Sequence, residues 1–159
     1  MEKKLLKNND IIVRNATILI DSEIYTISLL SNLSALIKEY YGVNINWVGF
    51  YLVEDDSLIL GPFQGQVACS IIKKGYGICG LSLLNNRIYN ISDVTKETNY
   101  ISCDYLSKSE LVIPIYKNNK IYGLLDLDSP IFSFFDEINA YFLEEIAKKL
   151  SSRLGKLEK

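Results

Sequence analysis

Hydrophobic positions recur with helical spacing at the start of the chain. Between Ser22 and Tyr41, apolar side chains follow one another at steps of three and four residues: Ile27, Leu30, Leu33, Ile37 and Tyr40. This spacing predicts an amphipathic helix. Gly42 comes directly after it and ends it. A shorter helix is predicted before it, around residues 4–20.

The middle of the chain changes to patterns that are typical of strands. "NWVGFYLV" (46–53) is rich in aromatic and branched residues and predicts a strand, with "SLILGPF" (57–63) as its hairpin partner. "SELVIPIYK" (109–117) and "KIYGLLDLDS" (120–129) predict a second hairpin, because Asn118 and Asn119 tolerate the positive φ of a two-residue turn. Between the hairpins, "KKGYGICG" (73–80) has three glycines, which predicts tight turns.

A third helical pattern lies near the end of the chain. The segment "FDEINAYFLEEIAKKLSSRL" (135–154) repeats apolar residues at helical spacing, and Ser133 with Asp136 resembles a capping box at its start. Strands joined by hairpins, with helices gathered at the chain ends, predict an α+β fold whose central antiparallel sheet is covered on one face by helices. The length, with no Pro- or Gly-rich linker, predicts a single domain over residues 1–159.

Composition narrows the classes of function. The net charge of −2 gives no electrostatic reason to expect nucleic acid or an anionic membrane as a partner. The N-terminus "MEKKLLKNND" has no signal-peptide core, and the apolar runs are far shorter than the roughly 20 residues that span a bilayer. We therefore expect a soluble, cytoplasmic protein.

The chain has three cysteines and no histidine. An odd number excludes a fully paired disulfide framework, and in a reducing cytosol disulfides are usually transient and catalytic. Without histidine there is no Cys–His pair and no Ser-His-Asp triad. Any general acid or base must therefore be Asp, Glu, Tyr, Lys or Cys.

Two aspartates share one face of a predicted strand. In "LLDLDS", Asp126 and Asp128 lie two residues apart, while Leu125 and Leu127 point to the other side. Like charges on one face are unfavourable unless a cation lies between them. The pair is either a solvated sheet edge or a site for a metal ion or an ammonium group.

Two aromatic residues share a face of another strand. Trp47 and Tyr51 lie four residues apart with Gly49 between them. They are either ordinary core aromatics or the walls of a hollow that the glycine leaves open. Such a hollow would suit a thioether methyl, because sulfur packs well on aromatic rings.

The cysteines stand in three different contexts. Free cysteines are commonly inert core residues. Cys79, however, lies between glycines in a predicted tight turn, which would leave it exposed and movable, and Cys103 lies among polar residues that do not suit a core. Cys69, Cys79 and Cys103 are spaced by 10 and 24 residues with no CxxC pair, which does not resemble a zinc site.

Several of these strings together resemble the free methionine-(R)-sulfoxide reductase family, which is built on a single GAF domain. They are "NWVGFYL", "LGPFQGQVAC", "KGYGICG", "SCDYLSKSELVIPI" and "YGLLDLDSP". The resemblance covers roughly residues 20–150 and includes all three cysteines at the family's spacing. The family's fold, a central antiparallel sheet with helices on one face, agrees with the pattern above. One departure is "DVTKETNYISCD", which has neither proline nor histidine where the family often has "FPGH".

The resemblance implies roles for the cysteines. Cys103 is similar to the nucleophile that attacks the sulfoxide sulfur. Cys79 is similar to the resolving thiol that forms a disulfide with the resulting sulfenic acid. Cys69 is similar to an auxiliary third cysteine. Thioredoxin would restore the dithiol, with no bound cofactor or metal.

The resemblance also implies a substrate pocket. Glu110, Asp126 and Asp128 match its carboxylates, and Trp47 and Tyr51 match its aromatic wall. A sulfoxide oxygen leaves only once it is protonated, and we expect Glu110 to supply that proton. Asp126 and Asp128 would then hold the ammonium that only the free amino acid carries.

Other hypotheses remain open at this point. The chain could be a non-catalytic GAF domain that senses a small ligand or a redox change. It could also be a metal-binding module that uses Asp126, Asp128 and Glu110. From the fold alone, a homodimer through the terminal helices is an expectation.

Overall fold

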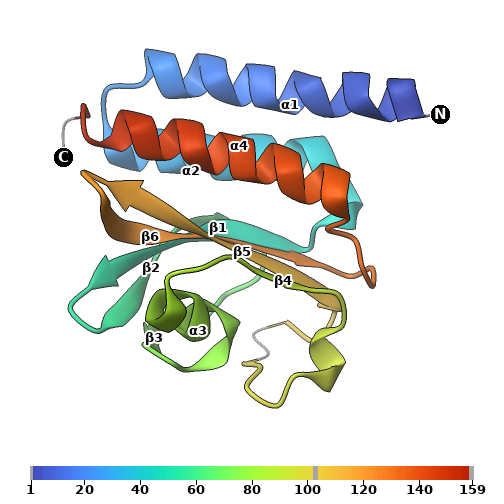
Figure 1. The fold of residues 1–159 in the computed structure, drawn as a ribbon, viewed down its shortest axis with the longest axis vertical. Helices are drawn as coiled ribbons and strands as arrows, with labels where there is room; N and C mark the ends of the chain where they lie inside the picture. Colours follow the sequence, from blue (N-terminus) through green and yellow to red (C-terminus); the bar gives the residue numbers. More distant parts are fainter. Residues whose placement is uncertain (1, 102–103, 158–159) are drawn as a thin grey trace.

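The structure is a computed structural model that describes residues 2–101 and 104–157, with side chains from Ile11 onward. Figure 1 shows the order of its elements. They are α1 (Glu2–Ser22), α2 (Thr26–Tyr41), β1 (Trp47–Glu54), β2 (Ser57–Gln64), β3 (Ile71–Lys73), α3 (Gly77–Asn85), β4 (Tyr89–Ile91), β5 (Ser109–Lys117), β6 (Lys120–Ser129) and α4 (Glu137–Leu154). The strands form one antiparallel sheet in the order β3-β2-β1-β6-β5-β4. The predicted α+β class is confirmed.

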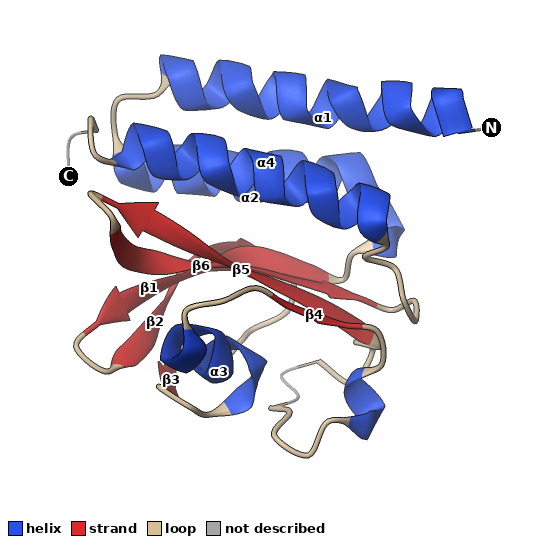
Figure 2. Ribbon diagram, in the orientation of Figure 1, coloured by secondary structure: helices blue, strands red, loops and turns tan. Residues whose placement is uncertain are grey.

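The sheet has helices on both sides, in unequal numbers (Figures 1 and 2). Helices α2 and α4 pack on one face, and α1 lies over them as an outer layer. Helix α3 and the loops around it cover part of the opposite face, against β3, β5 and β6. The larger apolar core fills the space between the sheet and the terminal helices, and a smaller one lies under α3.

The helices at the N-terminus differ in their bounds from the prediction. Helix α1 has 21 residues and is longer than α2, which has 16 and begins at Thr26 rather than at Ser22. Ile27 belongs to the predicted apolar stripe, but it is 60% exposed. Leu29 is buried in its place, because the buried stripe is set by the direction in which the helix meets the sheet. Gly42 ends α2 at a φ of +58°, as predicted.

The predicted capping box is wrong. Asp136 is itself the N-cap of α4, and its carboxylate accepts a hydrogen bond from the backbone N–H of Asn139 at 2.8 Å. Ser133 lies outside the helix with a φ of +53°. An N-cap residue has extended backbone and a side-chain acceptor, and Asp136 meets both requirements.

The second hairpin turns where the sequence predicts. Asn118 and Asn119 both have positive φ, 51° and 62°, and they join β5 to β6. The glycine-rich segment is only partly as expected. Gly75 and Gly77 do adopt positive φ, but residues from Gly77 onward form helix α3. Cys79 is therefore a buried helical residue and not an exposed one in a turn.

In the part of the chain that the structure describes, no helix has the length and apolar character needed to cross a membrane.

Candidate active site

Strand register gathers the pocket's acidic side chains on the face that carries α3. Trp47 of β1 pairs with Asp128 of β6, which pairs in turn with Glu110 of β5. Directly opposite residues of paired strands point to the same face, so these three side chains form a row across the sheet. Asp126 lies one step further along the same face, opposite Gly49. Leu125 and Leu127 point into the core beneath the terminal helices, as their alternation predicts.

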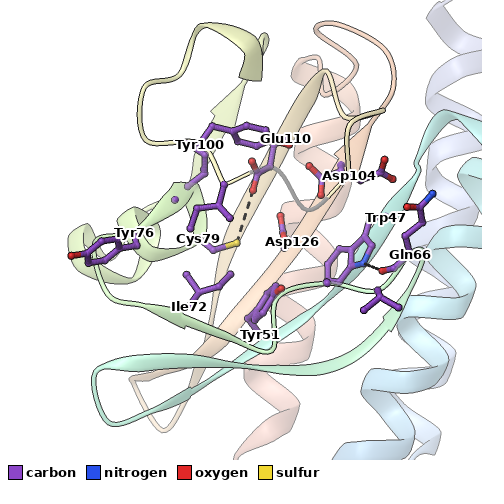
Figure 3. A pocket seen from close by; sticks show the side chains of 16 residues that line it. Trp47, Tyr51, Gln66, Ile72, Tyr76, Cys79, Tyr100, Asp104, Glu110 and Asp126 are labelled. Atoms are coloured by element: carbon purple, nitrogen blue, oxygen red, sulfur yellow. Dashed lines mark hydrogen bonds between the residues drawn. The ribbon is translucent and has the colours of Figure 1, made fainter.

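Helix α3 brings Cys79 to this row from above. The helix fits closely against the segment that precedes it, because a Cβ on Gly80 would lie 2.6 Å from the carbonyl oxygen of Lys73. The Cys79 thiol donates a hydrogen bond to Glu110 Oε1 at 3.9 Å. Figure 3 shows Cys79, Glu110 and Asp126 turned toward one another in the pocket.

Three stacked rings form the aromatic side of the site. The Trp47 ring centroid lies 5.9 Å from that of Tyr51 and 5.3 Å from that of Phe63. Of the two alternatives for Trp47 and Tyr51, the hollow at Gly49 is wrong, since a Cβ there would meet Phe63 and the Trp47 ring. The glycine lets the rings pack closely, and the pocket lies beside them.

The same aromatic residues fix the segment that carries Cys69. The Trp47 indole N–H donates to the Gln66 carbonyl at 3.0 Å, and the Tyr51 hydroxyl donates to the Cys69 carbonyl at 2.9 Å (Figure 3 shows the first). Cys69 is half-buried, whereas Cys79 is buried. Cys103 lies outside the described residues.

The pocket has further residues that the sequence does not single out. Tyr100, Ile101 and Asp104 line it. The Asn46 amide donates to Asp104 at 2.9 Å and to Ser107 at 3.0 Å, so it ties the segment after Asp104 to the start of β1. The sequence separation of about 60 residues leaves no local signal for this contact, although "SCDYLS" already marks a polar segment.

Acidic side chains dominate the polar part of the pocket. Glu110, Asp104, Asp126 and Asp128 line it, and none of its described lining residues is Lys or Arg. Burial raises the pKa of Asp126 to about 6. Burial, followed by the charge of Asp126, raises the pKa of Asp128 well above its ordinary range. Oδ1 of each aspartate has no hydrogen-bond partner among the described residues.

The pKa values of two neighbouring groups, the Cys79 thiol and the Tyr100 hydroxyl, are also raised. Burial raises the pKa of the Cys79 thiol strongly, and the charges of Asp126 and Glu110 raise it further. Burial, with the charges of Asp128 and Glu110, raises the pKa of Tyr100. Both groups are therefore neutral hydrogen-bond donors at physiological pH.

The fold and the pocket identify the general class of protein to which this chain belongs. Residues 10–154 match the GAF domain family, and the antiparallel six-stranded sheet with its helices is the fold of that family. A solved structure described as a putative GAF sensor protein from Burkholderia vietnamiensis is 29% identical, with a TM-score of 0.89, and covers 96% of each chain.

Other relatives narrow the class. The free methionine-R-sulfoxide reductase of Escherichia coli is 40% identical over 89% of this chain and 86% of its own length. A structure of fRMsr of Staphylococcus aureus in complex with substrate is 44% identical, with a TM-score of 0.86, over 92% of this chain and 95% of that one. The chain belongs to the free methionine-R-sulfoxide reductase family of GAF domain proteins.

Proposed function

We propose that the protein reduces free L-methionine-(R)-sulfoxide to methionine. The observation that carries this proposal is the composition of the pocket, in which three carboxyl groups face a wall of stacked aromatic rings beside a thiol. The relative from Escherichia coli bears the name of this activity, and the Staphylococcus aureus structure holds substrate. Both support the same assignment here.

The two sides of the pocket suit the two ends of this substrate. Asp126 and Asp128, each with an oxygen that lacks a partner, would accept the ammonium group. Trp47 and Tyr51 would contact the methyl-sulfinyl end, because sulfur and methyl groups pack favourably on aromatic faces. A methionine sulfoxide inside a peptide has no ammonium next to its side chain, so the acidic pair would select the free amino acid.

The proposed chemistry starts with Cys103. Its thiolate attacks the sulfoxide sulfur, and the oxygen passes to the cysteine sulfur. Methionine then leaves the pocket, and Cys103 is left as a sulfenic acid. The oxygen needs a proton in this step, and Glu110 is the proposed donor, with the half-buried Asp128 opposite it in the same row. Ile101 and Asp104, the described residues on either side of 102–103, both line the pocket, which supports Cys103 as the nucleophile.

A second thiol would then condense with the sulfenic acid, releasing water and forming a disulfide. The family resemblance suggests Cys79 for this step, but its surroundings suit Cys69 better. Cys79 is buried among carboxylates that suppress its thiolate, and the attacking species must be a thiolate. Cys69 is half-buried in a segment at the pocket wall. We therefore propose Cys69 as the resolving thiol, with thioredoxin as the dithiol that reduces the disulfide.

Turnover of defined substrates tests the proposal. We expect the reduced protein to convert free L-methionine-(R)-sulfoxide with dithiothreitol or thioredoxin, and to leave the S epimer and N-acetyl-methionine-(R)-sulfoxide unreacted. Cys103→Ser should abolish turnover. Equal activity in Cys103→Ser, or equal use of the N-acetyl compound, would contradict the proposal. Binding of a small ligand without any sulfoxide turnover would favour the sensor hypothesis instead.

Intact mass followed by peptide mapping distinguishes Cys69 from Cys79 as the resolving thiol. After exposure to substrate without reductant, the protein should lose about two mass units as a disulfide forms. Peptide mapping should find Cys69 joined to Cys103, and Cys69→Ser should accumulate the sulfenic acid. A Cys79–Cys103 peptide would instead assign resolution to Cys79.

We also propose that the protein is a homodimer through α1. Ile11 and Ile18 lie two helical turns apart on this helix and are 46% and 61% exposed. Light scattering after gel filtration should give twice the mass of the 18.1 kDa chain, and Ile18→Lys should give a monomer. A monomeric mass for the unmodified chain would contradict this.

A further inference from the structure

Three potential metal ligands lie together at the floor of the pocket. One ligand atom from each of Cys79, Glu110 and Asp126 lies within 4.8 Å of the other two, and all three residues are buried. Cys79 Sγ and Glu110 Oε1 are 3.9 Å apart. In a tetrahedral zinc site with sulfur and oxygen ligands, neighbouring ligand atoms are about 3.5 Å apart. Small side-chain adjustments would therefore bring three ligands to one ion, and water would take the fourth position.

A second observation points to a cation at the same place. Asp126 is only 6% exposed, and its Oδ1 lacks a hydrogen-bond partner among the described residues. No described lining residue of this pocket is a lysine or arginine that could balance the charge. A buried carboxylate oxygen without a partner is costly even where the other oxygen of the group is hydrogen-bonded, and a bound cation removes that cost.

The ligand set selects the kind of cation. Mg²⁺ and Ca²⁺ prefer shells made of oxygen alone, whereas one thiolate with two carboxylates suits a thiophilic ion such as Zn²⁺. We propose that the reduced protein binds one thiophilic divalent cation through Cys79, Glu110 and Asp126. Binding displaces the thiol proton, so one Zn–S bond forms and at least one proton is released.

The ion would occupy the space in which Asp126 meets the substrate ammonium. Metal and substrate would therefore exclude each other, and a bound ion would hold the enzyme inactive. This competition rests on the proposed function, but metal binding itself does not. The sequence-based metal hypothesis named Asp126, Asp128 and Glu110, whereas the geometry replaces Asp128 with Cys79.

The test is a titration of fully reduced, metal-free protein with Zn²⁺ against a chromophoric chelator. We expect one ion per chain, no competition by a large excess of Mg²⁺, and a thiolate-to-metal absorption band when Cd²⁺ replaces Zn²⁺. Cys79→Ser should weaken Zn²⁺ binding at least tenfold and remove the band. Asp126→Asn, which keeps the shape of the side chain, should also weaken it at least tenfold.

The other cysteines provide the matched control. The double variant Cys69→Ser/Cys103→Ser keeps only the Cys79 thiol and should bind Zn²⁺ with unchanged affinity. Loss of binding in this double variant, or unchanged affinity in both Cys79→Ser and Asp126→Asn, would overturn the proposal. Free methionine sulfoxide should lower the apparent Zn²⁺ affinity. If Zn²⁺ binds as described but no sulfoxide is ever reduced, the proposed function fails and the metal site stands.

Discussion

Asp126 is an ionisable residue that is largely removed from water. Its side chain is buried, faces the pocket and has a pKa raised to about 6 by burial. Below this pH the carboxyl group is protonated and cannot pair with an ammonium group. Above this pH the carboxylate is ionised and can pair with the ammonium group.

We therefore expect the KM for free methionine-(R)-sulfoxide to rise as pH falls through about 6. The rise should approach tenfold for each further pH unit. Steady-state kinetics between pH 5 and 8 with a chemical reductant measures this. Asp126→Asn should show a high KM that no longer changes with pH in this interval. A KM of the unmodified enzyme that stays flat across pH 6 would show that Asp126 does not hold the ammonium.

Tyr100 lines the pocket from the segment "DVTKETNYISCD", which has neither proline nor histidine. Its raised pKa keeps the phenol protonated, and Figure 3 shows it beside Glu110. Tyr100→Phe removes one donor that faces the acids, which should lower kcat/KM about two- to tenfold. Tyr76 also lines the pocket but is 61% exposed, so Tyr76→Phe should leave kcat/KM unchanged. Equal effects of the two variants would contradict a specific role for Tyr100.

At the level of the elements, the sequence predicts the two hairpins, three helices and the shared strand face of Asp126 and Asp128, opposite to that of Leu125 and Leu127. It does not predict α3, because glycine at three of eight positions argues for turns. The helix forms there because Ile78, Cys79 and Leu83 bury their side chains against the sheet, and this packing outweighs the low helix propensity of glycine.

The position of Glu110 also depends on a feature without a sequence signal. Near the turn, Tyr116 pairs with Ile121, but beyond it Ile115 pairs with Gly123, so β6 has an extra residue, Tyr122. Without this bulge the register of the turn would place Glu110 opposite a leucine, on the face toward the terminal helices. The bulge moves Glu110 to the row of Asp128.

Gly123 follows the bulge, and the strands approach each other closely there. A Cβ at this position would meet the carbonyl oxygen of Tyr51 in β1. We expect Gly123→Ala to lower the free energy of unfolding by about 1–3 kcal/mol, because backbone must move to admit the methyl group. Urea denaturation measures the loss.

Gly155→Ala is the matched control, since its methyl group would meet only the Asn118 side chain. This variant should change the free energy of unfolding by less than about 0.5 kcal/mol. Similar losses in the two variants would contradict this view of the bulge.

In the molecule as a whole, the helices on one side supply most of the apolar core, and the other side carries buried acids that oppose folding. Because burial raises the pKa of Asp126 to about 6 in the folded state, the unfolded chain releases this proton more readily. Stability therefore falls as pH rises from about 4 to about 6 and stays lower above that, by up to about 3 kcal/mol from this group.

Replacing Asp126 by a neutral side chain should restore the stability that is lost as pH rises. Asp126→Asn is expected to raise the free energy of unfolding by about 2–3 kcal/mol at pH 8, with a much smaller gain at pH 4, while it impairs substrate binding. Urea unfolding at the two pH values measures the two gains in stability.

Asp104 supplies the control, because it is also buried but accepts hydrogen bonds from Asn46 and from the backbone N–H of Leu106. Asp104→Asn should therefore destabilise the protein by about 1–2 kcal/mol. If Asp126→Asn were instead destabilising at pH 8, a partner such as a retained cation would have to stabilise the ionised aspartate. That outcome would link the stability of the molecule to the Cys79–Glu110–Asp126 metal site.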